Sequence, residues 1–272
     1  MVSCDDLLRA KSVCVPSASH VMALLIDIGN TRIKWARFEN GVLEPQSAAP
    51  HADWVVETLV DTILRQGNRA DRVLVSNVAG ARMAEVVRSA VAQTWQLEAE
   101  FITSTPLAGG IRNAYPQPAK LGVDRWLAMI GAHALERGAV CIVSVGTAMT
   151  IDGIAGDGRH LGGVIVPGPD LMVTSLLKNT SDIAQRAQQG ATSDGLFADN
   201  TLGAIRQGAD HALAALVERA VGVMRRTLNE TPKLLVTGGA SDRVEKALGM
   251  PYRAVPDLVL QGLAVLAREP RP

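Results

Sequence analysis

The chain has 272 residues, of which 47% are hydrophobic and 20% are charged. This length allows one large domain or two modest ones, and the composition is that of a globular protein, which excludes a disordered or collagen-like chain. Lysine plus arginine and aspartate plus glutamate number 27 each, so the net charge is zero and neither a nucleic acid nor an anionic membrane is expected as a partner.

The N-terminal segment and the cysteines indicate the cellular setting. Residues 1–21 contain two early aspartates and no sustained apolar run, which excludes a secretory signal, and we expect a disordered N-terminal extension there. No later stretch reaches the roughly 18 consecutive apolar residues of a membrane span. The three cysteines and five histidines lack the spacing of a zinc site or a disulfide scaffold. These features predict a cytoplasmic protein.

The first half of the chain alternates strand-like and helix-like patterns. Short apolar runs bounded by turn residues favour strands, and apolar residues at intervals of three and four favour helices. We predict strands over residues 23–28, 32–38, 42–45, 72–80 and 99–104, and helices over 52–67 and 81–95.

The second half begins after a helix predicted over residues 124–138, and it repeats the plan of the first strands. We predict strands over 139–145, 148–154, 160–166 and 233–239. In both halves a strand meets a turn that contains Gly and Thr, returns as a second strand, and turns again into a third. An internal repeat of this kind predicts two similar lobes, with a cleft between them that favours a ligand.

The stretch "LLIDIGNTRIK" at residues 24–34 places Asp27 in an apolar strand just before Gly29, Asn30 and Thr31. A plain β-hairpin explains the turn, because Gly and Asn tolerate positive φ. A phosphate cradle explains it as well, since backbone N–H groups and a hydroxyl can face an anion while Asp27 holds the accompanying metal ion.

With the second turn in view, the sequence resembles the actin, hexokinase and Hsp70-like ATPase superfamily, and within it the type III pantothenate kinases. The motifs that carry the resemblance are "DIGNTRIK", "YPQPAKLGVDRW", "VGTAMTID", "GGVIVPG", "NTLGAIRQG" and "VTGGA". It implies an α/β fold of two duplicated ribonuclease-H-like lobes, 22–134 and 135–272, with mixed sheets flanked by helices and a cleft between them. It also implies ATP-dependent phosphorylation of pantothenate to 4′-phosphopantothenate, the first step of coenzyme A biosynthesis.

The resemblance implies ATP with Mg²⁺ as cofactor and Asp27 as the residue that organises Mg²⁺ through water. Lys34 can equally be a solvated strand residue, Thr147 a threonine favoured by a hairpin strand, and the "VTGGA" glycines a plain strand-to-helix turn. The residues implied to bind ATP are Asp27, Ile28, Gly29, Asn30, Thr31, Arg32, Ile33, Lys34, Thr147, Gly238 and Gly239.

In "LGVDRW" the resemblance makes Asp124 the base that accepts the proton of the attacking pantothenate hydroxyl. An acid at this position is also typical of a helix N-cap or first turn. Arg125 suits a carboxylate or phosphate but also a structural ion pair, Tyr115 suits core packing, and Thr201 suits an N-cap. The residues implied to bind pantothenate are Tyr115, Gly122, Val123, Asp124, Arg125 and Thr201.

The sequence departs from the family pattern at Ser144, where many members carry an aspartate that helps to bind a monovalent cation, K⁺ or NH₄⁺. A hydroxyl binds such a cation less strongly, so cation dependence is in doubt here. The family also implies a homodimer with substrate sites near the subunit interface. Two rival functions are another small-molecule kinase of the superfamily and a nucleotide-binding regulatory protein that has lost catalysis.

Overall fold

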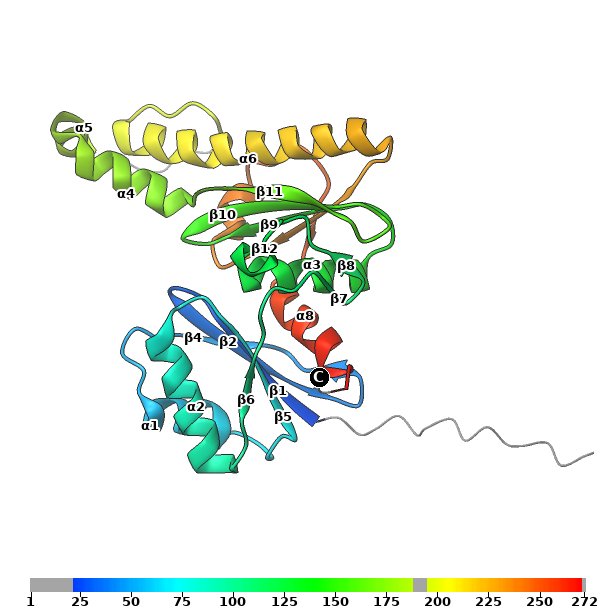
Figure 1. Ribbon diagram of the computed structural model, residues 1–272. Helices are drawn as coiled ribbons and strands as arrows, with labels where there is room; N and C mark the ends of the chain where they lie inside the picture. The colour runs from blue at the N-terminus through cyan, green and yellow to red at the C-terminus, as the bar shows by residue number, and fades with distance from the viewer. Residues whose placement is uncertain (1–21, 188–194, 271–272) are drawn as a thin grey trace, which may run out of the picture.

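The computed structural model describes residues 22–187 and 195–270, and the extension predicted over residues 1–21 lies outside them. Two β-sheets are stacked with helices between and around them, as Figure 1 shows. Within the described residues, none of the helices combines the length and the apolar character needed to cross a bilayer.

The first sheet has the strand order β3-β2-β1-β5-β6. Strand β1 pairs antiparallel with β2 and parallel with β5, and β6 continues the parallel edge. A further strand, β4, pairs with β2 beside β3. The strands are β1 Met22–Ile28, β2 Arg32–Glu39, β3 Val42–Leu43, β4 Ser47–Pro50, β5 Arg72–Asn77 and β6 Ala99–Phe101.

The second sheet repeats this order as β11-β10-β9-β12-β13. Strand β9 pairs antiparallel with β10 and parallel with β12, as β1 does with β2 and β5. The strands are β9 Val140–Val145, β10 Ala148–Ile154, β11 His160–Pro167, β12 Lys233–Thr237 and β13 Arg253–Ala254. The shared order and strand directions confirm the predicted fold of two duplicated ribonuclease-H-like lobes.

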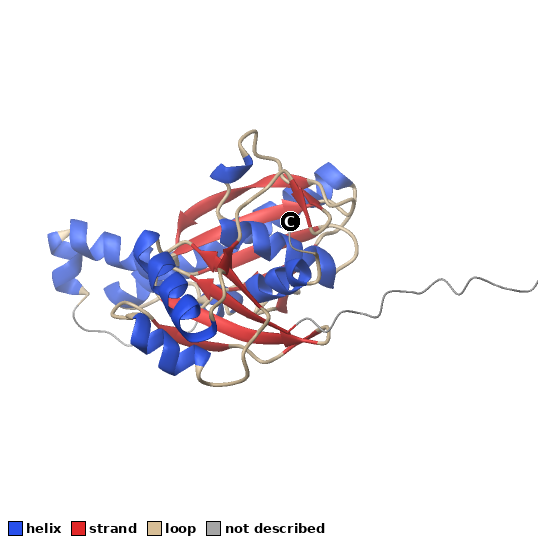
Figure 2. Ribbon diagram, turned by 60° about the horizontal axis from the view of Figure 1, so that its bottom comes forward, coloured by secondary structure: helices blue, strands red, loops and turns tan. Residues whose placement is uncertain are grey.

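The helices complete five layers, which Figure 1 shows in side view, and Figure 2 shows the helices in blue and the strands in red from a second direction. Helix α2 covers the outer face of the first sheet, α3 and α8 lie between the sheets, and α6 covers the far face of the second. The helices are α1 Val56–Leu59, η1 Val60–Leu64, α2 Ala81–Trp95, η2 Pro118–Lys120, α3 Val123–Leu135, α4 Pro169–Asn179, α5 Ser181–Arg186, α6 Thr201–Leu228, α7 Ser241–Glu245 and α8 Leu258–Ala267.

Alternation along the strands explains this layering. In β1, Leu24 and Ile26 pack towards α2, whereas Ala23 and Leu25 pack towards α8. Successive side chains of a strand point to opposite faces, so a strand that is apolar at every position requires cover on both sides. The uninterrupted apolar runs of the sequence are therefore the signature of central strands.

Several local elements differ from the sequence predictions. The helix predicted over residues 52–67 begins only at Val56 and continues as a π-helix, in which Arg65 N donates to Val60 O at 2.9 Å. Strands β4 and β13 and the hairpin of β7 (Leu107–Ala108) and β8 (Ile111–Arg112) are absent from the predictions. These four missed strands have only two to four residues each, and none of them lies within an apolar run long enough to show a period.

The backbones of α3 and α8 approach each other closely at two glycines. A Cβ atom on Gly131 would collide with the carbonyl oxygen of Leu258, and one on Gly262 would collide with the carbonyl oxygen of Leu127. These helices contact both sheets, so the small residues at their crossing set the distance between the lobes.

We expect Gly262→Ala to lower the free energy of unfolding by roughly 1–3 kcal/mol, because the added methyl forces α3 and α8 apart. Gly208, in the exposed middle of α6 with open space around it, provides the control. Gly208→Ala should leave stability unchanged or raise it, since Ala is the better helix former. Urea unfolding of both variants measures this, and equal stabilities would contradict the close-approach account.

Candidate functional site

Two turns, one from each lobe, face each other across the interface between the lobes. The hydroxyl oxygens of Thr31 and Thr147 lie 3.4 Å apart, although 116 residues separate them in the chain. Each turn is closed by a backbone hydrogen bond. Gly29 N donates to Arg32 O in the first turn, and Gly146 N donates to Ala148 O in the second. The hairpin and the cradle predicted from the sequence are thus compatible, because the candidate cradle is the turn of a hairpin.

The first turn presents its polar residues outwards and keeps its apolar ones inside. Asn30, Thr31 and Arg32 are exposed, whereas the side chains of Ile28 and Ile33 are fully buried in the core. Ile28 and Ile33, both predicted to bind ATP, therefore have only their backbone groups to offer to a ligand.

Asp27 is a buried carboxylate at the end of β1, with 8% of its surface exposed. Its Oδ1 atom has no hydrogen-bond partner, and its register neighbours are Lys34 on β2 and Ser76 on β5. Burial raises the pKa of Asp27 to about 6, the charge of Lys34 opposes the rise, and the charge of Asp124 adds to it. A buried carboxylate oxygen without a partner is suited to a cation.

The site has few carboxylates near the turns, which suits Mg²⁺ better than it suits a metal that several side chains ligate. Within residues 22–187 and 195–270, no three His, Cys, Asp or Glu side chains cluster as metal ligands. Mg²⁺ binds through one or two carboxylates together with water and substrate phosphates. Asp27 meets that requirement.

Lys34 is half-buried and extends across to the second half of the chain. Its Nζ atom donates to the carbonyl oxygen of Pro256 at 3.0 Å, just before α8. Burial lowers the pKa of Lys34, and the nearby Asp27 charge opposes that change. The lysine thereby connects the first turn to the segment that leads into the helix between the sheets.

Three loops of the second lobe meet at the end of β9. Gly168, which follows β11, donates its N–H to the carbonyl oxygen of Thr147 at 2.9 Å. Gly238 has a φ of +105°, and a Cβ atom there would collide with the backbone of Val145. Gly239 beside it has open space around its Cα. Gly168 and Gly238 thus hold the second turn in place by close backbone contact, a role for Gly168 that the sequence prediction missed.

Asp124 lies in the first turn of α3, while Gly122 occupies the N-cap position. The N-cap alternative for Asp124 is therefore wrong, and the first-turn alternative is right. Burial raises the pKa of Asp124 above its ordinary value, the charge of Arg125 opposes the rise, and the charge of Asp152 adds to it. Val123 packs against the core between α8 and the first sheet. A carboxylate with a raised pKa is a good candidate for a general base.

Arg125 is the centre of a buried polar cluster beside Asp124. It donates to both oxygens of Asp152, from Nε at 2.8 Å and from Nη2 at 2.6 Å, and from Nη1 to the hydroxyl of Tyr115 at 3.0 Å. Burial alone would lower the pKa of Arg125, but Asp152 raises it above its ordinary value. His160 lies with Nε2 3.1 Å from Asp152 Oδ1 and stacks on Tyr115. The arginine is thus held in one orientation.

Asp152 and His160 lie in the same cluster as Arg125 and Tyr115, and the sequence prediction did not include them. A Cβ atom on Gly163, opposite Asp152 in the β10–β11 register, would collide with the Asp152 carboxylate and the Arg125 guanidinium. The pair of adjacent glycines at 162 and 163 was the available signal, because glycines inside a strand mark close approach of other groups.

Thr201 lies apart from these residues. It is the first residue of α6, capped by Asn200, whose Oδ1 accepts the N–H of Gly203 at 2.8 Å. This end of α6 lies near α4 and α5, across the second sheet from the first lobe (Figure 1). Among the described residues, no hydrogen bond joins Thr201 to the other predicted site residues.

Comparison with known proteins gives one consistent result. The family model for type III pantothenate kinase matches residues 23–222. The type III pantothenate kinase of Nitrosococcus oceani is 36% identical over 253 residues, covering 91% of this chain and 94% of that protein. That of Aromatoleum aromaticum is 40% identical over 252 residues, covering 91% and 98%.

Solved structures agree in fold. The activator of 2-hydroxyisocaproyl-CoA dehydratase from Clostridium difficile, with bound ADPNP, superimposes with a TM-score of 0.53. The match covers 91% of this chain and 94% of that chain at 12% sequence identity. At such low identity the likeness concerns the fold alone.

The raised pKa of Asp27 predicts a stability that depends on pH. The pKa of Asp27 is 3.8 in the unfolded chain and about 6 in the folded one. At a pH between these two values, Asp27 keeps its proton in the folded state and has lost it in the unfolded state. The free energy of unfolding therefore falls as the pH rises through this range. We expect Asp27→Asn to be more stable than the unsubstituted chain by about 2–3 kcal/mol at pH 8 without ligand. The difference should vanish near pH 4. Urea unfolding from pH 4 to 8 measures it, and a difference independent of pH would contradict the assignment.

Proposed function

Because the chain belongs to the type III pantothenate kinase family, we propose that it transfers the γ-phosphoryl group of ATP to pantothenate in the cytoplasm. The product is 4′-phosphopantothenate, and the reaction is the first step of coenzyme A biosynthesis. The observation that carries this proposal is the meeting of the Thr31 and Thr147 hydroxyls beside two carboxylates with raised pKa values, Asp27 and Asp124.

The two turns are suited to hold the ATP phosphates from opposite sides. Thr31 and Thr147 offer hydroxyl donors, and the exposed turn residues Asn30 and Arg32 offer further polar groups. Asp27 would hold Mg²⁺ through water, and the ion would supply charge neutralisation for the transferring phosphoryl group. Phosphoryl transfer depends mostly on such positioning and charge stabilisation.

Asp124 is the proposed base. Its raised pKa favours acceptance of the proton that the pantothenate hydroxyl loses as it attacks phosphorus. Arg125 beside it is fixed by Asp152 and Tyr115, so its charge lies in a defined position from which it can attract the pantothenate carboxylate or the transferring phosphoryl group. The base and the cation both come from the start of α3, and Asp152, which fixes the cation, comes from β10.

The monovalent cation is the least supported cofactor. Ser144 is half-buried on β9, with Thr150 and Thr237 as its register neighbours, so hydroxyls surround a position where many family members carry a carboxylate. Neutral oxygens bind K⁺ or NH₄⁺ less strongly than a carboxylate does. We propose that activity depends only weakly on such a cation.

A homodimer is supported by apolar side chains that the single chain leaves exposed. On β11, Val164 and Ile165 are 44% and 60% exposed, and on α4, Leu171 and Leu176 are 43% and 40% exposed. Phe197, ahead of α6, is 89% exposed. A second copy of the chain is the proposed partner for this surface.

The homodimer also offers a role for Thr201. Its position at the α4 end of α6, apart from Arg125, suits a residue that reaches the substrate of the other subunit. We also propose that the two lobes comprise residues 22–134 and 135–272. With these boundaries, α8 belongs to the second lobe by sequence but packs on the first sheet.

Asp124→Asn tests the proposed mechanism. We expect turnover of ATP and pantothenate to fall by about 10² or more, the scale of a lost general base, with little change in ATP affinity. The assay measures ADP and phosphopantothenate in the presence of Mg²⁺. Asp157→Asn, in the exposed turn between β10 and β11, makes the same chemical change away from the site and should keep full activity.

The outcomes separate the rival functions. Unchanged turnover in Asp124→Asn would contradict the role of Asp124. Activity of the unsubstituted protein on a sugar or acetate, without activity on pantothenate, would indicate another small-molecule kinase of the superfamily. If none of these acceptors gave a phosphorylated product at high protein concentration, the result would favour the hypothesis of a nucleotide-binding regulatory protein.

A further inference from the structure

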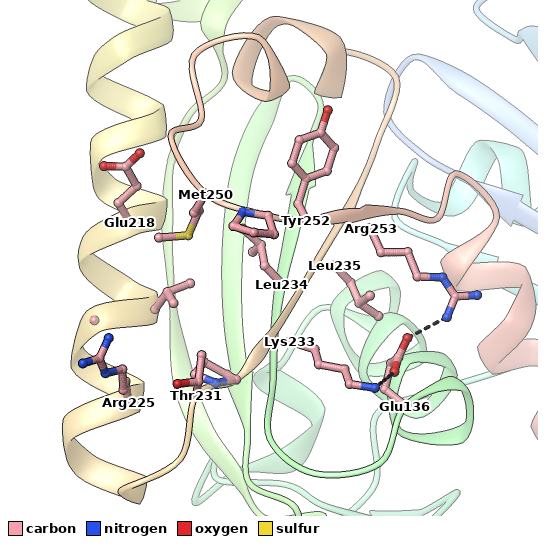
Figure 3. Close-up of a pocket in the computed structure, with 14 residues that line it drawn as sticks. Glu136, Glu218, Arg225, Thr231, Lys233, Leu234, Leu235, Met250, Tyr252 and Arg253 are labelled. Atoms are coloured by element: carbon pink, nitrogen blue, oxygen red, sulfur yellow. Dashed lines mark hydrogen bonds and ion pairs between the residues drawn. The ribbon is translucent and has the colours of Figure 1, made fainter.

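The second lobe has a cavity of about 490 Å³ that shares no residue with the phosphate turns or the Arg125 cluster. It lies between the C-terminal half of α6, the start of β12 and the segment over residues 250–253, as Figure 3 shows. Pockets that bind small molecules measure roughly 300–1,000 Å³ and are mostly apolar with a few polar groups. The volume of this cavity is within that range.

One wall of the cavity is apolar. Leu234 of β12 packs on the α6 side of the sheet, and with Val221 of α6, Met250 and Pro251 it lines the space between the helix and the strand. In Figure 3 Leu234 lies between α6 and the group formed by Lys233, Glu136 and Arg253. This wall suits the apolar body of an organic molecule.

Two cations are fixed at one end by a shared carboxylate. Lys233 Nζ lies 2.5 Å from one oxygen of Glu136, and Arg253 Nη1 lies 2.6 Å from the other. The Glu136 side chain is only 8% exposed, and the pKa of Glu136 is lowered by these two cations. The side chains of Lys233 and Arg253 are 58% and 56% exposed, so their remaining N–H donors are open to a ligand.

The charges around the cavity favour an anion. Besides Lys233 and Arg253, Arg225 lies across the cavity from them, where it is exposed to solvent (Figure 3). Against these three cations stand two carboxylates, Glu136 and Glu218, and the latter accepts the N–H of Gly249 at 2.9 Å. The lining therefore carries one excess positive charge.

We propose that this cavity binds a small organic anion whose apolar body packs on Leu234, Val221 and Met250 and whose anionic group contacts Lys233 and Arg253. The proposal does not depend on the kinase function, because the cavity and the phosphate turns share no residue. It rests on three features that coincide in one place: the volume, the apolar wall and a pair of cations held by a buried carboxylate.

Gly222 provides a substitution that fills the cavity. It lines the cavity from α6, and a Cβ atom there would lie 3.6 Å from Arg226 Nη1, so a side chain fits without collision. Gly208 on the same helix has nothing within 4 Å of its would-be Cβ atom and does not line the cavity. Gly222→Leu and Gly208→Leu thus make the same change on one helix, inside and outside the cavity.

The probes are 8-anilinonaphthalene-1-sulfonate and its uncharged analogue N-phenyl-1-naphthylamine, titrated by fluorescence into the full-length protein. We expect saturable binding of the sulfonate, a Kd raised at least tenfold in Gly222→Leu, and no change in Gly208→Leu. Lys233→Gln, in which Arg253 still pairs with Glu136, should weaken binding of the sulfonate about threefold or more and leave the uncharged probe unaffected. Lys246→Gln, a surface change on the segment after α7, is its control.

Equal sulfonate affinities in the two leucine variants would overturn the proposal, as would absence of saturable binding. If Gly222→Leu fails to fold, the exposed Lys233→Gln decides the question alone. Recognition of the anion by Lys233 would be contradicted if Lys233→Gln weakened binding of both probes equally. It would also be contradicted if this variant bound both probes as tightly as the unsubstituted protein does.

Discussion

The burial of Asp27 is the constraint on which the rest of the site depends. Its carboxylate lies at the end of a central strand, and one of its oxygens has no hydrogen-bond partner. The pKa of Asp27 is raised because burial removes the charged carboxylate from water, which is unfavourable in free energy. A fold retains such a cost where a cation or a reaction makes use of the charge. Lys34, across the β1–β2 pair, and Asp124, at the start of α3, both act on this carboxylate through their own charges.

The duplicated fold explains how the two turns come to face each other. Each sheet ends its first strand in a Gly and Thr turn, and the crossing of α3 and α8 holds the sheets at a fixed separation. The hydroxyl oxygens of Thr31 and Thr147, one from each turn, lie 3.4 Å apart, and the backbones of α3 and α8 between the sheets are in close contact at Gly131 and Gly262.

Much of this could be predicted from sequence, and what could not has physical reasons. Uninterrupted apolar strands and the repeated turn predicted both sheets, since a central strand must be apolar on both faces. The Arg125–Asp152–His160 cluster was missed, because it joins α3, β10 and β11 through a strand register, and the glycines at 162 and 163 indicate a close approach there without naming the residues that meet. The π-helix after Leu59 keeps a helical apolar period, so the sequence did not distinguish it from an α-helix.

The central claim is that the two turns hold one phosphate chain together. The most direct measurement is a double-mutant cycle with Thr31→Val and Thr147→Val, using the affinity for the Mg²⁺ complex of a non-hydrolysable ATP analogue by calorimetry. If both hydroxyls hold one ligand, each single variant binds more weakly and the double variant departs from additivity, with a coupling of about 0.5 kcal/mol or more. Strictly additive losses, or a variant that binds normally, would contradict the shared cradle.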